Sequence, residues 1–233
     1  MSADSYEIRL CPNCGLRYPL TGGHPFDKAQ GRPFGERCPS CLGETQVVLK
    51  RTYSPLPFGR EGSRVRGNLS ALLDNLRSAW NVGAIFRTAD GLGLDRLYLC
   101  GITPTPENEA LRKTSLGAEE TVAWEYSPNA LETAKRLKGE GCRLVALEQD
   151  ERAIPVEQIG NLFRGQIANL SHTVLILGNE VTGVDPELLD LCDQIVYIPM
   201  RGRKRSFNVE VTFAIAVYAL FNTDPTISSP PAR

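Results

Sequence analysis

The spacing of hydrophobic positions changes near residue 68, and it predicts alternating strands and helices from there on. The apolar run LSALLD at 69–74 predicts a buried strand, and NVGAIFRTADGLG at 81–93 has apolar residues at helical spacing. RLYLCG at 96–101 predicts a second strand. Further along we expect a polar helix near 129–139, strands in CRLVALE, TVLILGN and QIVYIP, a helix in PELLDLC, and an apolar helix over 209–221.

Strands that alternate with helices indicate an α/β domain with a mostly parallel sheet and helices on both faces. We assign this domain to residues 68–223 and expect a disordered tail over 224–233. The final helix is apolar on almost every side, which exceeds what a one-faced surface helix needs. It is therefore either fully buried or part of a subunit interface.

Residues 1–50 differ in character, because they are rich in Gly, Pro and charge and have few aliphatic residues. Such a segment cannot bury enough apolar area to hold itself together. Two C-x-x-C pairs suit a tetrahedral zinc site, with Cys11, Cys14, Cys38 and Cys41 as the ligands. We therefore predict a zinc-ribbon-like module, the alternative being a redox or incidental cysteine set, with His24 a less favoured ligand.

Residues 51–67 contain a Pro/Gly/Arg-rich stretch in which apolar residues follow neither the helical nor the strand spacing, and this predicts a linker. The net charge of the whole chain is only −1, so nucleic-acid binding has to rest on local clusters. One cluster contains Arg64 and Arg66, and its alternative reading is a solvated surface. The second is RGRKR, with Arg201, Arg203, Lys204 and Arg205.

Composition narrows the class of protein further. With 42% hydrophobic and 23% charged residues, the chain has the balance of a globular protein and is not expected to be disordered. We predict no membrane span, no secretory signal and a cytoplasmic location, because no apolar run approaches the roughly 20 residues that cross a bilayer. The remaining cysteines, Cys100, Cys142 and Cys192, read as buried small hydrophobes.

Two polar loops follow predicted strands and mark the expected site. GNEVTG follows TVLIL, and PMRGRKRSFN follows QIVYI. Ligands of parallel α/β sheets bind beyond the carboxyl ends of the strands, so these loops would define a cleft. Neither loop matches the G-x-G-x-x-G fingerprint or the P-loop, which disfavours a nucleotide-phosphate cradle.

Three segments, in order and in loop context, resemble the three motifs of the SpoU methyltransferase family of the SPOUT superfamily. They are NLRSAWNVGAIFRTADGLG, LILGNEVTGV and IPMRGRKRSFNVEVTFAIAVYAL, and the resemblance covers roughly residues 68–222. It implies a C-terminal trefoil knot, S-adenosylmethionine as cofactor, a homodimer, and methyl transfer to a ribose 2′-hydroxyl of transfer or ribosomal RNA. The cysteine module lies outside the family pattern.

The resemblance also assigns residues. The catalytic candidates are Asn81, Arg87, Glu180, Ser206 and Asn208, and the cofactor candidates are Leu177, Gly178, Ile198, Met200 and Phe207. The RNA candidates are the two basic clusters. Glu210 stands where many members carry serine, which puts any role of that serine in doubt here.

Structural alternatives stand beside these assignments. Asn81 and Asn208 both precede helical segments and could be N-caps, and Glu180 could favour a helix dipole. Arg87 is the family candidate for activating the hydroxyl, but a guanidinium stays protonated, so either a substrate phosphate helps it or it only positions that phosphate. The chain could also be an inactive RNA-binding protein with the same fold, or a base-modifying enzyme. The zinc module could dock RNA or act as a structural cap.

Overall fold

The computed structural model divides into two compact units, residues 1–64 and 65–233, and each is described by itself. It describes residues 4–21, 37–53, 68–159 and 172–221. Arg64, Arg66, His24 and the predicted tail lie outside these ranges.

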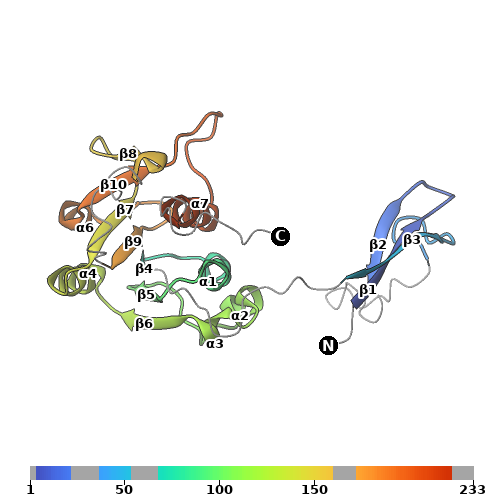
Figure 1. Ribbon diagram of the computed structural model, residues 1–233, viewed down its shortest axis with the longest axis horizontal. Coiled ribbons are helices and arrows are strands. Elements are labelled where there is room, and N and C mark those ends of the chain that lie inside the picture. Colours follow the sequence, from blue (N-terminus) through green and yellow to red (C-terminus); the bar gives the residue numbers. More distant parts are fainter. Residues whose placement is uncertain (1–3, 22–36, 54–67, 160–171, 222–233) are drawn as a thin grey trace, which may run out of the picture. The chain divides into compact units, whose positions relative to one another are not determined.

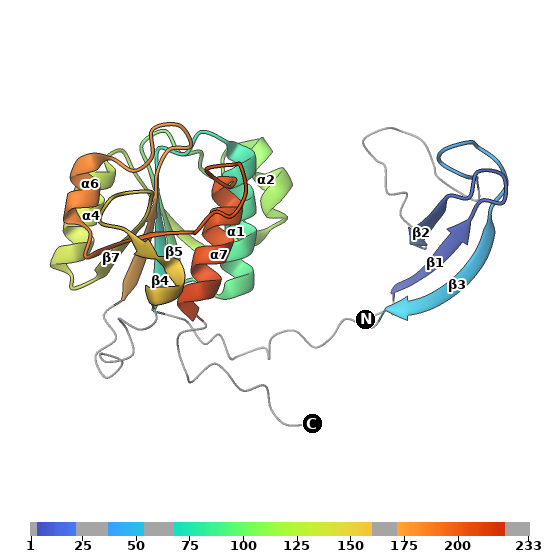
Figure 2. The same cartoon turned by 90° about the horizontal axis from the view of Figure 1, so that it is seen from above.

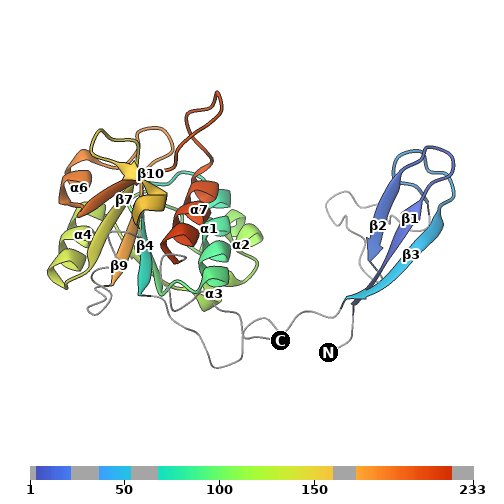
Figure 3. The same cartoon turned by 45° about the horizontal axis from the view of Figure 1, so that its top comes forward.

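The first unit is a three-stranded antiparallel sheet. Strands β1 (Asp4–Leu10), β2 (Arg17–Thr21) and β3 (Gln46–Tyr53) are ordered β2-β1-β3, as Figure 3 shows. Across residues 7–20 and 37–52, the part of this unit whose burial is described, only Arg9, Cys11 and Cys38 are buried. The sheet therefore has almost no apolar core, and another interaction must hold it together.

The second unit is built on a seven-stranded sheet, ordered β6-β5-β4-β9-β7-β10-β8, in which every pairing is parallel (Figure 1). All six residues of the central strand β4 are buried, as the apolar run LSALLD predicts. The predicted α/β class with a mostly parallel sheet is confirmed. The strands are β4 (Leu69–Asp74), β5 (Arg96–Cys100), β6 (Ala123–Ser127), β7 (Arg143–Leu147), β8 (Ile154–Pro155), β9 (Thr173–Leu177) and β10 (Gln194–Tyr197).

Helices cover both faces of this sheet (Figure 2). On one face α1 (Ala79–Leu92), α2 (Glu109–Ser115), α3 (Ala118–Thr121), the short helix η1 (Val156–Gln158) and α7 (Val209–Phe221) enclose a core that includes Phe86 and Phe213. On the other face α4 (Ala130–Gly139) and α6 (Pro186–Leu191) pack around Leu72 and Leu137. Alternate residues of each central strand supply the two cores, because strand side chains point to opposite faces.

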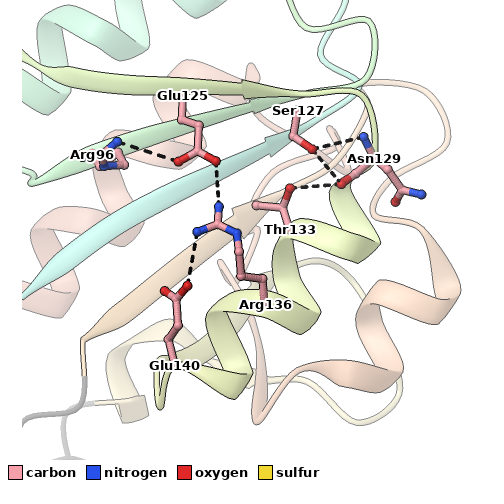
Figure 4. Close-up of polar contacts among 7 residues, drawn as sticks. All are labelled: Arg96, Glu125, Ser127, Asn129, Thr133, Arg136 and Glu140. Carbon is pink, nitrogen blue, oxygen red and sulfur yellow. Dashed lines mark hydrogen bonds and ion pairs between the residues drawn. The ribbon is translucent and has the colours of Figure 1, made fainter.

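The outer strand β6 was not predicted, and polar contacts tie it to its neighbours. Glu125 of β6 accepts from Arg136 of α4 at 2.7 Å and lies 3.8 Å from Arg96 of β5, and Arg136 also reaches Glu140 at 3.3 Å (Figure 4). Arg136 lies over the ring of Tyr98, 5.8 Å from its centroid. These side chains are about 39–54% exposed, so each ion pair contributes only about 0.2–1 kcal/mol. Together they fix α4 against the edge of the sheet.

Strand order brings distant parts of the sequence together. β9 lies between β4 and β7, and β7 lies between β9 and β10, so the carboxyl ends of four strands meet at one edge. This edge is where a parallel sheet binds its ligand. The order of strands alone does not define a threaded loop, and the trefoil knot stays a prediction. None of the helices in the described ranges combines the length and hydrophobicity that crossing a bilayer requires.

Candidate active site and metal centre

A cavity of about 570 Å³ opens at the carboxyl ends of β7, β9 and β10. Its size is that of a typical small-molecule site. Apolar walls come from Leu147, Leu177, Ile198 and Phe207, and the rest of the lining is mostly polar. All but one of the predicted catalytic and cofactor residues line it: Asn81, Glu180, Ser206, Asn208, Leu177, Gly178, Ile198, Met200 and Phe207.

The loop after β9 is folded back tightly on itself. Asn179 and Gly183 exchange two backbone hydrogen bonds, at 3.0 and 2.9 Å, and the Asn179 side chain accepts from the N–H of Val181 at 2.9 Å. A Cβ on Gly178 would lie 2.2 Å from the backbone carbon of Gly183. Glycine is therefore required at 178 for the loop to close beside the cavity.

Glu180 joins this loop to the start of α1. Its carboxylate accepts from the backbone N–H of Arg77 at 3.0 Å and of Ser78 at 3.3 Å. Although partial burial opposes ionisation, the backbone N–H donors of Glu180, Arg77 and Ser78 hold the pKa of the Glu180 carboxyl below its ordinary value. The Asn179 side chain adds a second link by donating to the carbonyl of Asn75 at 2.7 Å. Glu180 thus sits at a helix N-terminus and also fixes the loop.

Ser78 is the N-cap of α1, since its hydroxyl accepts from the N–H of Asn81. The alternative that Asn81 caps this helix is therefore wrong. Its side chain faces the last helix, where the amide of Asn208 donates to Asn81 Oδ1 at 3.1 Å. Asn208 does act as a cap for α7, because its Oδ1 accepts from the N–H of Glu210 at 2.9 Å. One residue of the third motif therefore both starts a helix and orients Asn81.

Residues after β7 complete the cavity, and no sequence motif marks them. The Glu148 carboxylate accepts from the N–H groups of Val184 at 3.0 Å and of Gln149 at 2.8 Å. The Gln149 side chain donates to the carbonyl of Arg205 and so holds the basic loop beside the cavity. In the sequence, the only hint of their role is that two polar residues follow the predicted strand CRLVAL directly. The strand order is needed to show that β7 lies next to β9.

Arg87 is the predicted catalytic residue that does not line this cavity. It is exposed on α1, six residues after Asn81 and so about 9 Å further along the helix axis. Next to it, Thr88 donates to a carboxylate oxygen of Glu210 at 2.8 Å, which links α1 to α7. An apolar hollow between these helices is lined by Thr88, Leu92, Ala214, Ile215, Tyr218 and Ala219, among others.

The four arginine and lysine residues of RGRKR are exposed. Arg205 lines the main cavity, and Arg203, Lys204 and Arg205 line a neighbouring hollow together with Asp150 and Glu151. The loop therefore presents positive charge next to the cavity.

The four predicted ligands of the first unit form one cluster. The sulfurs of Cys11, Cys14, Cys38 and Cys41 all lie within 4.8 Å of one another, with Cys11 to Cys41 and Cys14 to Cys38 both at 3.5 Å. Zinc–sulfur bonds of about 2.3 Å in a tetrahedron place sulfurs about 3.8 Å apart, so the cluster fits a metal ion.

The two turns that carry the cysteines have the same hydrogen bonds. Gly15 donates to the carbonyl of Cys11 and Leu42 to that of Cys38, both at 2.9 Å, while the N–H groups of Cys11 and Cys38 each donate to a carbonyl five residues on. Gly15 and Leu42 occupy the same left-handed position, with φ of 75° and 60°. Asn13 of the first turn donates its side-chain amide to the sulfur of Cys41 in the second turn, and this hydrogen bond is the main cause that lowers the pKa of the Cys41 thiol to about 6.

Residues 68–218 match the family described as SpoU rRNA Methylase. The chain belongs to this family. Among SpoU relatives, the 23S rRNA (guanosine-2′-O-)-methyltransferase RlmB of Acinetobacter baylyi is 32% identical over 91% of this chain and 80% of its own length. The tRNA (guanosine(18)-2′-O)-methyltransferase of Escherichia coli K12 is 26% identical over 67% of this chain and 64% of its own length.

Solved structures of SpoU proteins share the fold. The tRNA-modifying enzyme TrmH/SpoU of A. aeolicus matches with a TM-score of 0.58 at 26% identity, over 67% of this chain and 75% of that chain. The SpoU methyltransferase AviRb of Streptomyces viridochromogenes, solved in complex with AdoMet, matches with a TM-score of 0.57 at 25% identity, over 69% and 61%. The SpoU family match begins at residue 68, so it leaves the cysteine unit outside.

Proposed function

We propose that this SpoU protein transfers a methyl group from S-adenosylmethionine to a ribose 2′-hydroxyl of RNA. One observation carries the proposal: residues of all three family motifs, Asn81, Glu180 and Asn208, line a single cavity at the carboxyl edge of the sheet. The relatives described above are named as 2′-O-methyltransferases of ribosomal and transfer RNA. Both names specify guanosine, so guanosine is the nucleoside we expect to be modified. For such a substrate we propose a cytoplasmic location.

The cavity suits the cofactor in its chemistry. S-adenosylmethionine would supply a methyl group on a positively charged sulfur. Leu177, Ile198 and Phe207 offer apolar walls for a purine ring, while Gly178 lets the backbone come close to a ligand. Ser206 and Asn208 lie at the same cavity and can orient the ribose or the cofactor. The structure of the similar protein AviRb, solved with AdoMet bound, supports this assignment.

Arg87 has a positioning task in this proposal. A guanidinium stays protonated, so Arg87 is a poor proton acceptor and a good partner for the phosphate next to the reacting ribose. Binding that phosphate aligns the oxygen with the methyl group, and the phosphate itself can share the hydroxyl proton.

We also propose a homodimer, and the position of Arg87 supports it. Arg87 is outside the cavity of its own chain, next to the apolar hollow between α1 and α7. In α7, Tyr218 is 63% exposed and Val211 is 40% exposed. A second copy seated on this hollow would cover both helices and lie beside Arg87. RGRKR would then meet the RNA backbone next to the cavity.

Zinc is the metal we assign to the four cysteines, in a structural role. Four thiolates leave no open position for a substrate, which is typical of structural zinc. The ion replaces the apolar core that the first unit lacks.

Incubation of the purified protein with labelled S-adenosylmethionine and total RNA from cells lacking the protein tests the proposal. We expect label in RNA with the wild type and at least a hundredfold slower labelling with Arg87→Ala, since positioning effects reach this size. The matched control is Arg96→Ala, a partly exposed arginine at the amino end of β5, whereas the cavity lies at the carboxyl ends of the strands. Cofactor binding without any labelling of ribosomal or transfer RNA would instead favour an RNA-binding protein that has lost its activity.

A further inference from the structure

The two units of the chain carry opposite net charges. Residues 1–64 contain nine Lys and Arg against six Asp and Glu, a net charge of +3. Residues 65–233 contain 17 Lys and Arg against 21 Asp and Glu, a net charge of −4. The unit that carries the proposed catalytic cavity therefore repels a polyanion at long range, apart from its basic loop, and the smaller unit attracts it.

The two faces of the small sheet differ in how their charges are used. On one face Glu7 of β1 pairs with Lys50 of β3 at 2.8 Å and with the buried Arg9 at 3.4 Å. Glu7 offsets one of the two positive charges, and the remaining charge belongs largely to Arg9, which is buried and so cannot reach a partner. This face has little charge left to offer a partner.

The other face carries basic side chains without such partners. Leu10 is paired with Arg17, and Ile8 is paired with Leu49, which places Arg17 and Arg51 on the same face as Ile8 because alternate residues share a face. Arg17 and Arg51 are exposed, and within the described residues no carboxylate forms an ion pair with either. Leu49 between them is 37% exposed.

The spacing of the two arginines fits a nucleic-acid strand. Their partners on β1 are four residues apart, about 14 Å along the sheet. In a duplex each strand carries a phosphate about every 3.4 Å of helix axis, so 14 Å spans about four phosphates and one strand crossing this face can reach both arginines. The apolar surface of Ile8 and Leu49 between them can contact bases or sugars.

We propose that the sheet face bearing Arg17 and Arg51 docks the RNA substrate through its backbone. This inference rests on the proposed function for the identity of the polyanion. Of the two roles considered for the zinc module, the inference favours docking of RNA over a structural cap on the catalytic domain. The competing occupant is the acidic second unit of the same chain, and the experiment separates the two.

The test measures binding of the full-length, zinc-loaded protein to a fluorescent oligouridine over a series of salt concentrations. Arg17→Ala and Arg51→Ala are each expected to weaken binding and to lower the slope of log K against log salt by about 0.7, one phosphate contact each. Arg51→Glu should weaken binding further. The matched control is Lys50→Ala, which removes a neighbouring positive charge on the same strand but from the opposite face, and it should leave the slope unchanged.

Zinc content and the unfolding temperature are measured for every variant, so a folding defect is recognised. Equal effects of Lys50→Ala and Arg51→Ala, or no effect of any variant, would overturn the inference. A drop in the unfolding temperature of the second unit in Arg17→Ala or Arg51→Ala, with RNA binding unchanged, would assign the face to that unit instead. If every variant still methylates RNA and binds it with unchanged affinity, the docking face is refuted and the proposed function is not. If the arginine variants weaken RNA binding but the wild type forms no methylated product, the proposed function is refuted and the docking face is not.

Discussion

The side-chain amide of Asn208 donates to Asn81 Oδ1 at 3.1 Å, joining the start of the last helix to the first turn of α1 across 127 residues of sequence. Asn208 also caps α7 through its Oδ1. The first and third family motifs are therefore held together by one side chain, which places both beside the cavity.

Substitutions at Asn208 separate capping from site assembly. Asp keeps the capping oxygen but cannot donate to Asn81, so Asn208→Asp should leave the free energy of unfolding within about 0.5 kcal/mol of wild type while lowering methyl transfer. Asn208→Ala loses both contacts and should destabilise the protein by about 1–2 kcal/mol. Chemical denaturation and methyl-transfer rates measure the two effects. Equal activity in Asn208→Asp and the wild type would show that capping is the whole role of this residue.

Glu180 makes the site sensitive to acid. Because its folded-state pKa lies below the ordinary 4.5, the ionised carboxylate stabilises the loop above about that pH and loses this contribution as the pH falls through the lowered pKa. We expect cofactor affinity, measured by calorimetry, to decline in this acidic range. Glu180→Gln cannot accept both N–H groups equally well, so it should lower the free energy of unfolding by about 1 kcal/mol at neutral pH. The effect is small because the side chain is largely exposed. The substitution should also remove this part of the pH dependence. An unchanged pH profile in Glu180→Gln would contradict the role.

Gly178 limits what the cavity can tolerate. Gly178→Ala forces a methyl group against the backbone of Gly183, so the loop must shift and cofactor binding should fall at least tenfold. Gly139→Ala is the control, because a Cβ there would meet nothing within 4 Å. Cofactor titration of both variants gives the comparison, and equal affinities would mean that the loop does not shape the cavity.

The metal-held turns make a prediction about one leucine. Leu42 holds the left-handed conformation that Gly15 holds in the equivalent turn, and this conformation costs a residue with a side chain about 1–2 kcal/mol. Leu42→Gly should therefore stabilise the first unit by about 0.5–1 kcal/mol, and Gly15→Ala should destabilise it by a similar amount. Resistance of the bound zinc to a competing chelator measures both.

Removal of zinc should unfold this unit and leave the unfolding temperature of the second unit unchanged. Zinc loss without unfolding would refute the structural role.

Much of the second unit could be predicted because its elements are long or strongly apolar. The buried run of β4 and the helical spacing of α1 are set by local sequence, and the expected helix over 209–221 has the bounds of α7. By contrast, α2, α3 and β6 are short or half-exposed, so they have too few periodic positions for a prediction.

The cavity could be predicted only in part. Gly178, Glu180 and Asn208 belong to motifs that a resemblance can align. Glu148 and Gln149 belong to no motif, and they reach the cavity because β7 lies next to both β9 and β10, an order that long-range pairing decides. Likewise, the pattern that singled out Arg87 could not show that it lies outside the cavity of its own chain.

The position of the transferred methyl group tests the central claim most directly. A phosphodiester next to a 2′-O-methylated ribose resists alkali, because the oxygen that would attack the phosphate is blocked. RNA labelled by this protein, digested with alkali and separated, should therefore carry its label in alkali-resistant dinucleotides that begin with guanosine, and Arg87→Ala should yield almost none. Label in alkali-released mononucleotides would place the methyl group on a base and contradict ribose methylation.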